Sequence, residues 1–412
     1  MVSSLRRLPG AGLLTAMLVV LACDKVAPRA SREGAAIGLC ERQPHLEADS
    51  YSDAVLVRRF GDADGITFGE IKAVVVDAEG NLFVADGVAR NVTMISSDGR
   101  AIGQFGRSGS GPGEFLYPVT LAMTAHDTIA VFDAQRWIIS YYGTDGSYGR
   151  QEHLPAMAGF GQDATITIEP DGRIFALTYT NFQRTIEESL GRRRKGIGQG
   201  VIGIAELDRQ RGRWNERFSV RGQEVFVDRE EGSLRDIWFG AKAQLAGAGG
   251  MIWTGDGRSG DIVMFTVATG RSCRGRLPGY PHTVSQAERD SFYFAKDLIW
   301  RGTDRVTRAR ARRRNVELPH AKAYISQLIA DEQSVWVRTP SPEPDRDRWI
   351  LIDATMAVRR VLHLPSSVTL LFARGDRLYG RRHTPEGVPV LEEYSIVDVP
   401  VAQTAVPTSH PQ

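Results

Sequence analysis

The most constraining feature of the sequence is a segment that repeats after 47 residues. Asp86 recurs as Asp133, and the pair Asp98-Gly99 recurs as Asp145-Gly146, each 47 positions further on. Between these landmarks lie short runs with alternating apolar residues, and Asp-Gly or Gly-rich turns separate them. This pattern indicates short antiparallel strands joined by hairpins, so the chain is predicted to be all-β.

Four strands fit into each repeat. The first unit is predicted to hold strands at 73–76, 82–85, 92–95 and 101–105, and the second at 119–123, 129–132, 138–141 and 148–154. A period in the mid-forties with four strands is typical of a β-propeller blade. Later units share an aromatic residue after an aliphatic one in the second strand, which we expect to fill the space between blades: Phe83, Phe175, Trp253, Trp336 and Tyr379. Counting second strands predicts six four-stranded antiparallel blades.

The two ends of the repeat region predict how the ring closes. The last unit offers strands at 368–372, 377–380 and 388–396 but lacks a fourth. An unassigned strand at 55–60 is expected to supply it, which would join the last blade to the first and remove the open edges. The propeller is predicted to span residues 51–400, followed by a disordered tail at 401–412.

The N-terminus indicates export. Residues 1–22 combine Arg6 and Arg7 with an apolar run at 11–22 that is too short to span a bilayer, which predicts a signal peptide. Residues 20–23 resemble a bacterial lipobox, which implies that Cys23 is lipidated and that residues 23–50 form a lipid-anchored tether on the periplasmic side of an envelope membrane. An ordinary signal peptide cleaved nearby is the alternative, and the sequence does not choose between inner and outer membrane.

Charge and cysteine content narrow the function further. The chain has 51 basic and 49 acidic residues, and the signal segment carries two of the basic ones, so the remainder is balanced. Balanced charge argues against a dedicated nucleic-acid binder. Apart from Cys23, the chain holds Cys40 and Cys273. An oxidising compartment would permit a disulfide between them, and two separate thiols are the alternative.

The segment FGRSGSGPGEFLYPVTLAM at 105–123 resembles the NHL repeat, with its Gly-Pro-Gly-x-Phe followed by Pro and an apolar strand. The segment at 84–92 resembles the strand-Asp-turn portion of the same repeat. The whole chain is similar to bacterial lipoproteins described as six-bladed β-propellers. Related folds include lactonases and lyases that hold a metal ion in the central channel, so the resemblance implies that Ca²⁺ or Zn²⁺ there is an option, although no cofactor is predicted.

Three insertions are predicted to lie on one face of the propeller. They occupy residues 181–200, 221–239 and 281–319, and each is a connection between blades or between a second and a third strand. The last is expected to contain a helix between blades four and five. Ser285 and Glu288 form a capping box at its start. An apolar stripe at helical spacing would pack on the rim or, alternatively, bind a partner; it comprises Ala287, Phe294, Ala295, Leu298 and Ile299.

Arginine-rich stretches in two of these insertions are a candidate anionic-ligand face, because guanidinium groups suit carboxylates and phosphates. The candidate residues are Arg192, Arg193, Arg194, Lys195, Arg308, Arg310, Arg312, Arg313 and Arg314. The alternative is a neutral surface, in which acids of the middle insertion pair with these cations. Those acids are Glu224, Asp228, Glu230, Glu231 and Asp236.

Catalytic motifs are absent from the sequence, so no catalytic residue is assigned. A second candidate site is the mouth of the central channel, where loop residues from several blades would meet. Its candidate residues are Asp86, Asp133, Asp256, Arg338 and His383. For the aspartates, the alternative is capping of turns, since Asp accepts hydrogen bonds from nearby backbone N–H groups.

The leading hypothesis is a lipid-anchored binding or scaffolding module that engages a protein, peptide or saccharide through the insertion-rich face. The alternative is a metal-dependent hydrolase, lactonase or lyase with a site at the central channel. The sequence does not identify the ligand, the oligomeric state, or whether the protein is an enzyme.

Overall fold

A computed structural model describes residues 37–45, 51–61, 65–125, 127–157, 165–230, 232–278, 282–291, 317–341, 343 and 345–398. The predicted signal peptide, Cys23, the tail at 401–412, all of the helical stripe except Ala287, and Arg308 to Arg314 lie outside these ranges. No helix in the described ranges is long and apolar enough to cross a membrane.

The described strands form six sheets, which confirms the prediction of a six-bladed propeller. Blades one and two each have four strands in chain order from the inside outward. Blade one contains β3 (Ile71–Val76), β4 (Leu82–Asp86), β5 (Asn91–Ile95) and β6 (Ala101–Phe105). Blade two contains β7 (Pro118–Thr124), β8 (Thr128–Asp133), β9 (Ile138–Gly143) and β10 (Tyr148–His153).

Blades three and four each carry a fifth strand beyond the four that the repeat predicts. Blade three contains β11 (Ile166–Ile168), β12 (Ile174–Thr178), β13 (Lys195–Asp208), β14 (Arg213–Asp228) and β15 (Ser233–Asp236). Blade four contains β16 (Gln244–Ala248), β17 (Met251–Gly255), β18 (Asp261–Thr266) and β19 (Arg271–Arg276), with β1 (Gly38–Leu39) outside them.

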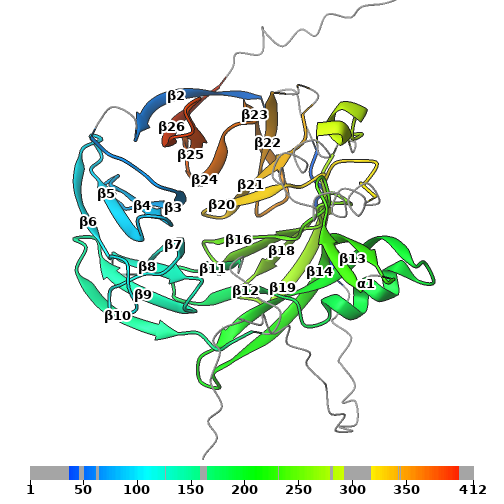
Figure 1. Ribbon diagram of the computed structural model, residues 1–412. Helices are drawn as coiled ribbons and strands as arrows, with labels where there is room; N and C mark the ends of the chain where they lie inside the picture. The colour runs from blue at the N-terminus through cyan, green and yellow to red at the C-terminus, as the bar shows by residue number, and fades with distance from the viewer. Residues whose placement is uncertain are drawn as a thin grey trace, which may run out of the picture. The chain divides into compact units, whose positions relative to one another are not determined.

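Blades five and six complete the ring. Blade five contains β20 (Gln327–Asp331), β21 (Ser334–Thr339), β22 (Arg346–Asp353) and β23 (Val358–Pro365). Blade six contains β24 (Thr369–Arg374), β25 (Arg377–His383), β26 (Pro389–Asp398) and β2 (Ser52–Phe60). The innermost strands contact one another in a closed circle, from β3 through β7, β11, β16, β20 and β24 back to β3 (Figure 1).

The closing strand lies where the sequence predicts it. β2 pairs antiparallel with β26, from Ser52 opposite Asp398 to Phe60 opposite Leu391. Two buried carboxylates on β26 accept bonds from β2, with Arg58 Nε 2.6 Å from Glu393 and Arg59 Nε 3.0 Å from Glu392. A buried charge is tolerated when it is paired in this way, so these contacts fix the register at the junction.

Apolar side chains between neighbouring blades form the core. Each of six buried clusters combines residues from two adjacent blades, including the pair formed by blades six and one. The five second-strand aromatics are all buried in these clusters, as expected for residues that fill the space between blades. Blade two uses Phe132 in the same role. The whole ring is therefore held by side chains that each blade presents to its two neighbours.

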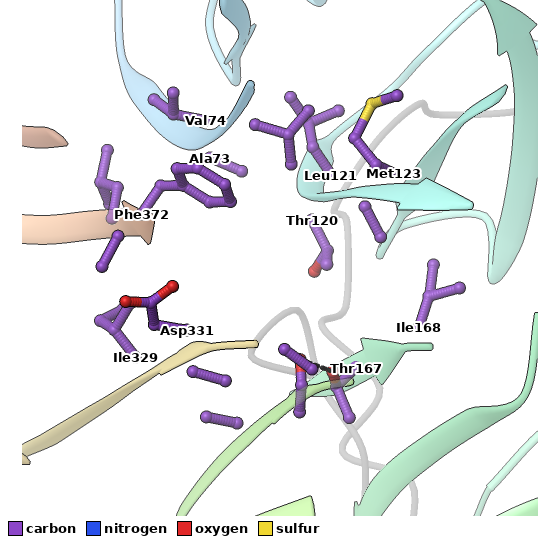
Figure 2. A pocket seen from close by; sticks show the side chains of 18 of the residues that line it. Ala73, Val74, Thr120, Leu121, Met123, Thr167, Ile168, Ile329, Asp331 and Phe372 are labelled. Carbon is purple, nitrogen blue, oxygen red and sulfur yellow. Dashed lines mark hydrogen bonds between the residues drawn. The ribbon is translucent and has the colours of Figure 1, made fainter. Parts of the chain in front are cut away.

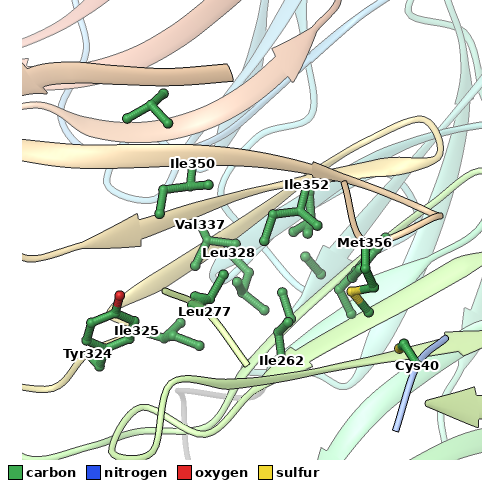
Figure 3. Close-up of a cluster of buried hydrophobic side chains, with 14 residues drawn as sticks. Cys40, Ile262, Leu277, Tyr324, Ile325, Leu328, Val337, Ile350, Ile352 and Met356 are labelled. Carbon is green, nitrogen blue, oxygen red and sulfur yellow. The ribbon is translucent and has the colours of Figure 1, made fainter. Parts of the chain in front are cut away.

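The expectation of a tether over residues 23–50 needs correction for residues 37–45. This stretch lies against blades four and five, because β1 pairs in parallel with β19 and Cys40 forms a disulfide with Cys273. Cys40 also packs with apolar residues of both blades, including Met356 (Figure 3). Tyr51 then bridges Val361 of blade five before β2 joins blade six. The chain's start therefore spans three consecutive blades on the outside of the ring.

The insertion at 181–200 contains a helix that the sequence reading did not anticipate. α1 (Phe182–Leu190) buries Ile186 and Leu190 against Val225 and Val227 of β14. The stretch expected to link blades three and four instead continues the sheet through β14 and β15. Between blades four and five, residues 286–291 are helical, and the Ser285–Glu288 capping box forms as predicted.

Candidate functional site

The described residues line a cavity in the central channel and another cavity at the connections between blades. We call the face with the connections between blades and between second and third strands the upper face. The opposite face carries the hairpin turns between first and second strands and between third and fourth strands. The described parts of the three insertions belong by topology to the upper face.

Arg258 contacts the connection between blades three and four and the connection between blades four and five. It follows β17, and its Nε donates to Glu224 of β14 at 2.8 Å, with a second guanidinium bond to the same carboxylate. Its Nη1 donates to the carbonyl of Ala321 at 2.6 Å, in the connection between blades four and five. Glu224 also accepts the backbone N–H of Ala241 at 3.0 Å. One partly buried ion pair therefore holds together the loop after β17, the connection between blades three and four, and the connection between blades four and five.

A cavity of about 450 Å³ opens on the upper face between blades four and five. We call it the upper pocket; it is lined by Phe239, Gly240, Lys242, Gln244, Lys322, Ala323, Ile325, Ser326, Arg338, Pro340, Ser341, Glu343, Arg346 and Asp347. Two of its cations are paired, since Arg338 Nε lies 2.9 Å from Asp347 and Lys322 lies 2.6 Å from Glu288. Among the described residues, no carboxylate pairs with Lys242, so the pocket offers one free ammonium.

The backbone at the edge of this pocket is unusual. Phe239 has a φ of 62°, in the left-handed region that bulky residues rarely adopt. Arg258 Nη2 lies 3.5 Å from the Phe239 carbonyl. Trp238, beside it, is one of the exposed large apolar residues of the described chain. Strained backbone of this kind is retained where surrounding contacts hold it, and it is common at ligand sites.

Two of the four described cations of the predicted anionic-ligand face pair with acids of the middle insertion. Lys195 Nζ lies 3.1 Å from Asp228 and 3.2 Å from Glu230, and Arg194 lies 3.7 Å from Glu230. Arg193 donates to the carbonyls of Leu190 and Ile197. These contacts follow the neutral alternative, in which acids of the middle insertion pair with the cations. Arg192 lies beside them, exposed at the end of α1.

Asp86 and Asp133 cap turns. Asp86 is 1% exposed, and its carboxylate accepts four backbone N–H groups at 2.6–3.0 Å, from Gly69, Glu70, Val88 and Ala89. Asp133 accepts the equivalent four bonds in blade two. Each aspartate therefore joins the connection that enters its blade to the loop after its second strand. The 47-residue repeat reflects this structural role.

The other three residues of the predicted channel mouth do not converge with these two. Asp256 accepts the N–H of Arg258 at 2.8 Å, Arg338 lines the upper pocket, and His383 is exposed at the end of β25. None of the five is among the described residues that line the central cavity. The prediction that these five residues ring the channel mouth therefore needs correction. The three aspartates instead accept hydrogen bonds from the backbone of their own turns.

The central cavity has a volume of about 640 Å³ and is lined by all six innermost strands (Figure 2). Its wall is mainly apolar, with Val74, Leu121, Met123 and Phe372 among the lining residues. Charged residues lie mainly near the end formed by the first hairpin turns. Within the described residues, no group of three or more His, Cys, Asp or Glu side chains is placed to hold a metal ion.

Two carboxyl groups in this region are buried. Burial raises the pKa of Glu169, which follows β11, to about 7, and it raises the pKa of Asp331, at the end of β20, to about 6. Each accepts a backbone N–H from the next blade, Glu169 from Gly250 at 2.8 Å and Asp331 from Gly375 at 3.3 Å. Sequence reasoning missed both, because the partners lie 81 and 44 residues away.

Comparison with known proteins agrees with the fold. A family model described as a six-bladed β-propeller matches residues 40–182. None of the curated proteins compared with the chain matches it.

Several solved structures are similar in fold at low sequence identity. A protein described as exported from Bacteroides fragilis is 12% identical, with 87% of this chain and 98% of that chain covered and a TM-score of 0.43. A Bacteroides vulgatus protein is 10% identical, with 85% of this chain and 100% of that chain covered and a TM-score of 0.48. Virginiamycin B lyase from Staphylococcus aureus is 10% identical, with 82% of this chain and 99% of that chain covered and a TM-score of 0.40.

Proposed function

We propose that this chain is an exported binding module that engages a protein, peptide or saccharide through its upper face. The observation that carries the proposal is the junction at Arg258, which holds connections of three blades together beside the upper pocket. A surface fixed in advance loses less conformational entropy on binding than a set of free loops. The free Lys242 ammonium and the exposed Trp238 indole give that surface a charge and an aromatic contact.

Export is part of the proposal. The basic and apolar segments at 1–22 favour it, and so does the disulfide between Cys40 and Cys273, since disulfides persist in oxidising compartments. We propose that Cys23 carries lipid and that the propeller lies on the periplasmic side of the envelope. Metabolic labelling with a palmitate analogue tests this. Label that is lost in a Cys23→Ser variant supports the anchor, and an unlabelled wild-type protein rules it out.

The test of binding uses arrays of glycans and peptides probed with the mature protein. Lys242→Glu reverses the free charge in the upper pocket, and Arg213→Glu is the matched control. Arg213 is exposed at the start of β14, next to the hairpin turn on the opposite face. We expect Lys242→Glu to abolish retention of the ligands that the wild type binds and Arg213→Glu to leave it unchanged. Equal retention by both variants, or no retention by the wild type, would overturn the proposal.

The second candidate function is a metal-dependent hydrolase, lactonase or lyase at the central channel. The buried carboxyl group of Asp331 favours it, because a carboxyl with a raised pKa in the lining of a cavity is suited to acid–base chemistry. Elemental analysis of the purified protein separates the two functions. A stoichiometric bound Ca²⁺ or Zn²⁺ that is lost on Asp331→Asn substitution would favour the enzyme.

A further inference from the structure

The central channel has the walls of a small-molecule site. Its volume of about 640 Å³ falls in the range typical of ligand pockets, roughly 300–1,000 Å³. Val74, Leu121, Met123, Ile329 and Phe372 line it with apolar surface (Figure 2). A cavity of this kind favours a ligand with an apolar body, because transfer of that body out of water is favourable.

One polar group in this wall, the carboxyl of Asp331, accepts a single hydrogen bond from the described residues. Asp331 is only 7% exposed, and Figure 2 shows its carboxyl projecting from β20 into the cavity. Its Oδ1 accepts the Gly375 N–H at the long distance of 3.3 Å. Within the described residues, no donor bonds to its Oδ2. The residue is largely buried while this oxygen remains open to the cavity, so a ligand in the cavity can donate a hydrogen bond to it.

Nearby cations do not neutralise this carboxyl. Arg374, on the next innermost strand, donates through its Nη1 to the carbonyls of Val76 and Asp77 at 3.2 and 2.9 Å. Lys72, the other cation of the lining, lies 2.6 Å from Glu70. The lining also includes three further acids, which are Asp77, Asp127 and Glu332. This end of the channel is therefore electronegative, and a cation is attracted to it.

We propose that the central channel binds an apolar organic cation whose ammonium group pairs with Asp331. The apolar part fills the space between the innermost strands, and the ammonium supplies the donor that Oδ2 lacks. A single carboxyl suits an ammonium, whereas Ca²⁺ takes six to eight oxygen ligands. The inference does not depend on the function proposed for the upper face, since none of the lining residues of the upper pocket lines this cavity.

The test compares three probes with one carbon skeleton: 4-phenylbutylamine, 4-phenylbutanol and 4-phenylbutyrate. Calorimetry with the mature protein measures their affinities at pH 7.5. We expect the amine to bind most tightly and the carboxylate most weakly. Asp331→Asn keeps an acceptor for Gly375, so we expect it to fold and to weaken amine binding about tenfold or more, as expected for a largely buried charge pair. Binding of the alcohol should change by less than about twofold.

Two further variants guard against misleading results. Asp145→Asn removes an exposed charge that lies outside the cavity lining and should leave amine binding nearly unchanged. Thr120→Phe adds a ring to a side chain that points into the cavity, so it should abolish binding of both amine and alcohol (Figure 2). If the three probes bind equally, if none binds, or if Asp331→Asn binds the amine as the wild type does, the proposal is wrong.

The pH dependence gives an independent readout. The amine stays charged below pH 9, whereas burial raises the pKa of Asp331 to about 6. The charged groups that face this carboxyl are Arg374, Asp376 and Glu332. The adjacent turn of blade four adds no charge, because it consists of Gly249 and Gly250. We expect amine affinity to rise between pH 5 and pH 7, and alcohol affinity to stay flat. A flat amine profile would contradict pairing with Asp331.

Discussion

Glu169 is predicted to make the stability of the propeller depend on pH. Its side chain is 1% exposed, and its Oε2 accepts the Gly250 N–H of the next blade at 2.8 Å. Its Oε1 is buried without a hydrogen-bond donor. Burial is the main reason that the pKa rises from 4.5 to about 7. Replacement by Gln keeps the acceptor for Gly250 and removes the charge.

The expected magnitude follows from the shift in pKa. The folded protein holds the Glu169 proton up to about pH 7, whereas the unfolded chain releases it near 4.5. The free energy of unfolding therefore falls as pH rises between these values, at about 1.4 kcal/mol per unit. The full cost is present above pH 7 and amounts to at most about 3 kcal/mol. Glu169→Gln should gain this amount at pH 8.5 and much less at pH 5.

Urea denaturation from pH 5 to pH 8.5 measures the effect as the difference between variant and wild type. Other groups titrate in the same range, Asp331 among them, but they are common to both proteins and cancel in the difference. Glu332→Gln, at an exposed acid, is the control and should show no such trend. If the Glu169→Gln difference is the same at every pH, the carboxyl is not held protonated by burial and the reasoning fails.

Two further predictions concern the rigid parts of the ring. Replacing Cys40 and Cys273 by Ser removes a cross-link that spans 233 residues, which should lower the free energy of unfolding by about 5 kcal/mol because the unfolded chain gains entropy. Urea denaturation of the oxidised wild type and of the variant measures this difference, and an unchanged midpoint contradicts it. Asp133→Ala leaves four backbone N–H groups without their acceptor and should lower the free energy of unfolding by roughly 3 kcal/mol. Asp145→Ala, at an exposed turn, is the control, and an equal effect of the two would argue against the capping role.

The repeat made the regular blades predictable. Alternating strands and Asp-Gly turns define blade one so well that the strand at 101–105 was predicted with the bounds of β6. The closing strand was also predictable, because one unit lacked a strand and another stretch had a spare one. These predictions succeed because the local pattern and the global fold agree.

Blade three shows where local pattern fails. The first half of β13 has Gly196, Gly198 and Gly200 at its buried positions, so no apolar side chains alternate with polar ones there. Its partner β14 and the packing of α1 hold it in the sheet. A helical spacing was present in Phe182, Ile186 and Leu190, but the surrounding charges concealed it.

The candidate sites were less predictable than the fold. Arg258 bonds to Glu224 and to the carbonyl of Ala321, which lie 34 and 63 residues away in sequence. Asp331 becomes distinctive only because the ring places it beside an apolar channel. No linear motif encodes either arrangement. The residues that did repeat, Asp86 and Asp133, repeat because blades one and two use the same turn.

The pairing of β2 with β26 also limits when blade six can form during synthesis of the chain. Ser52 and its partner Asp398 are 346 residues apart, so the ribosome needs about 20–70 s between them at the usual 5–20 residues per second. Throughout that interval β2 has no partner strand, so the backbone N–H and C=O groups that later bond to β26 stay unpaired. A chaperone that covers this strand would prevent it from pairing with strands of other chains.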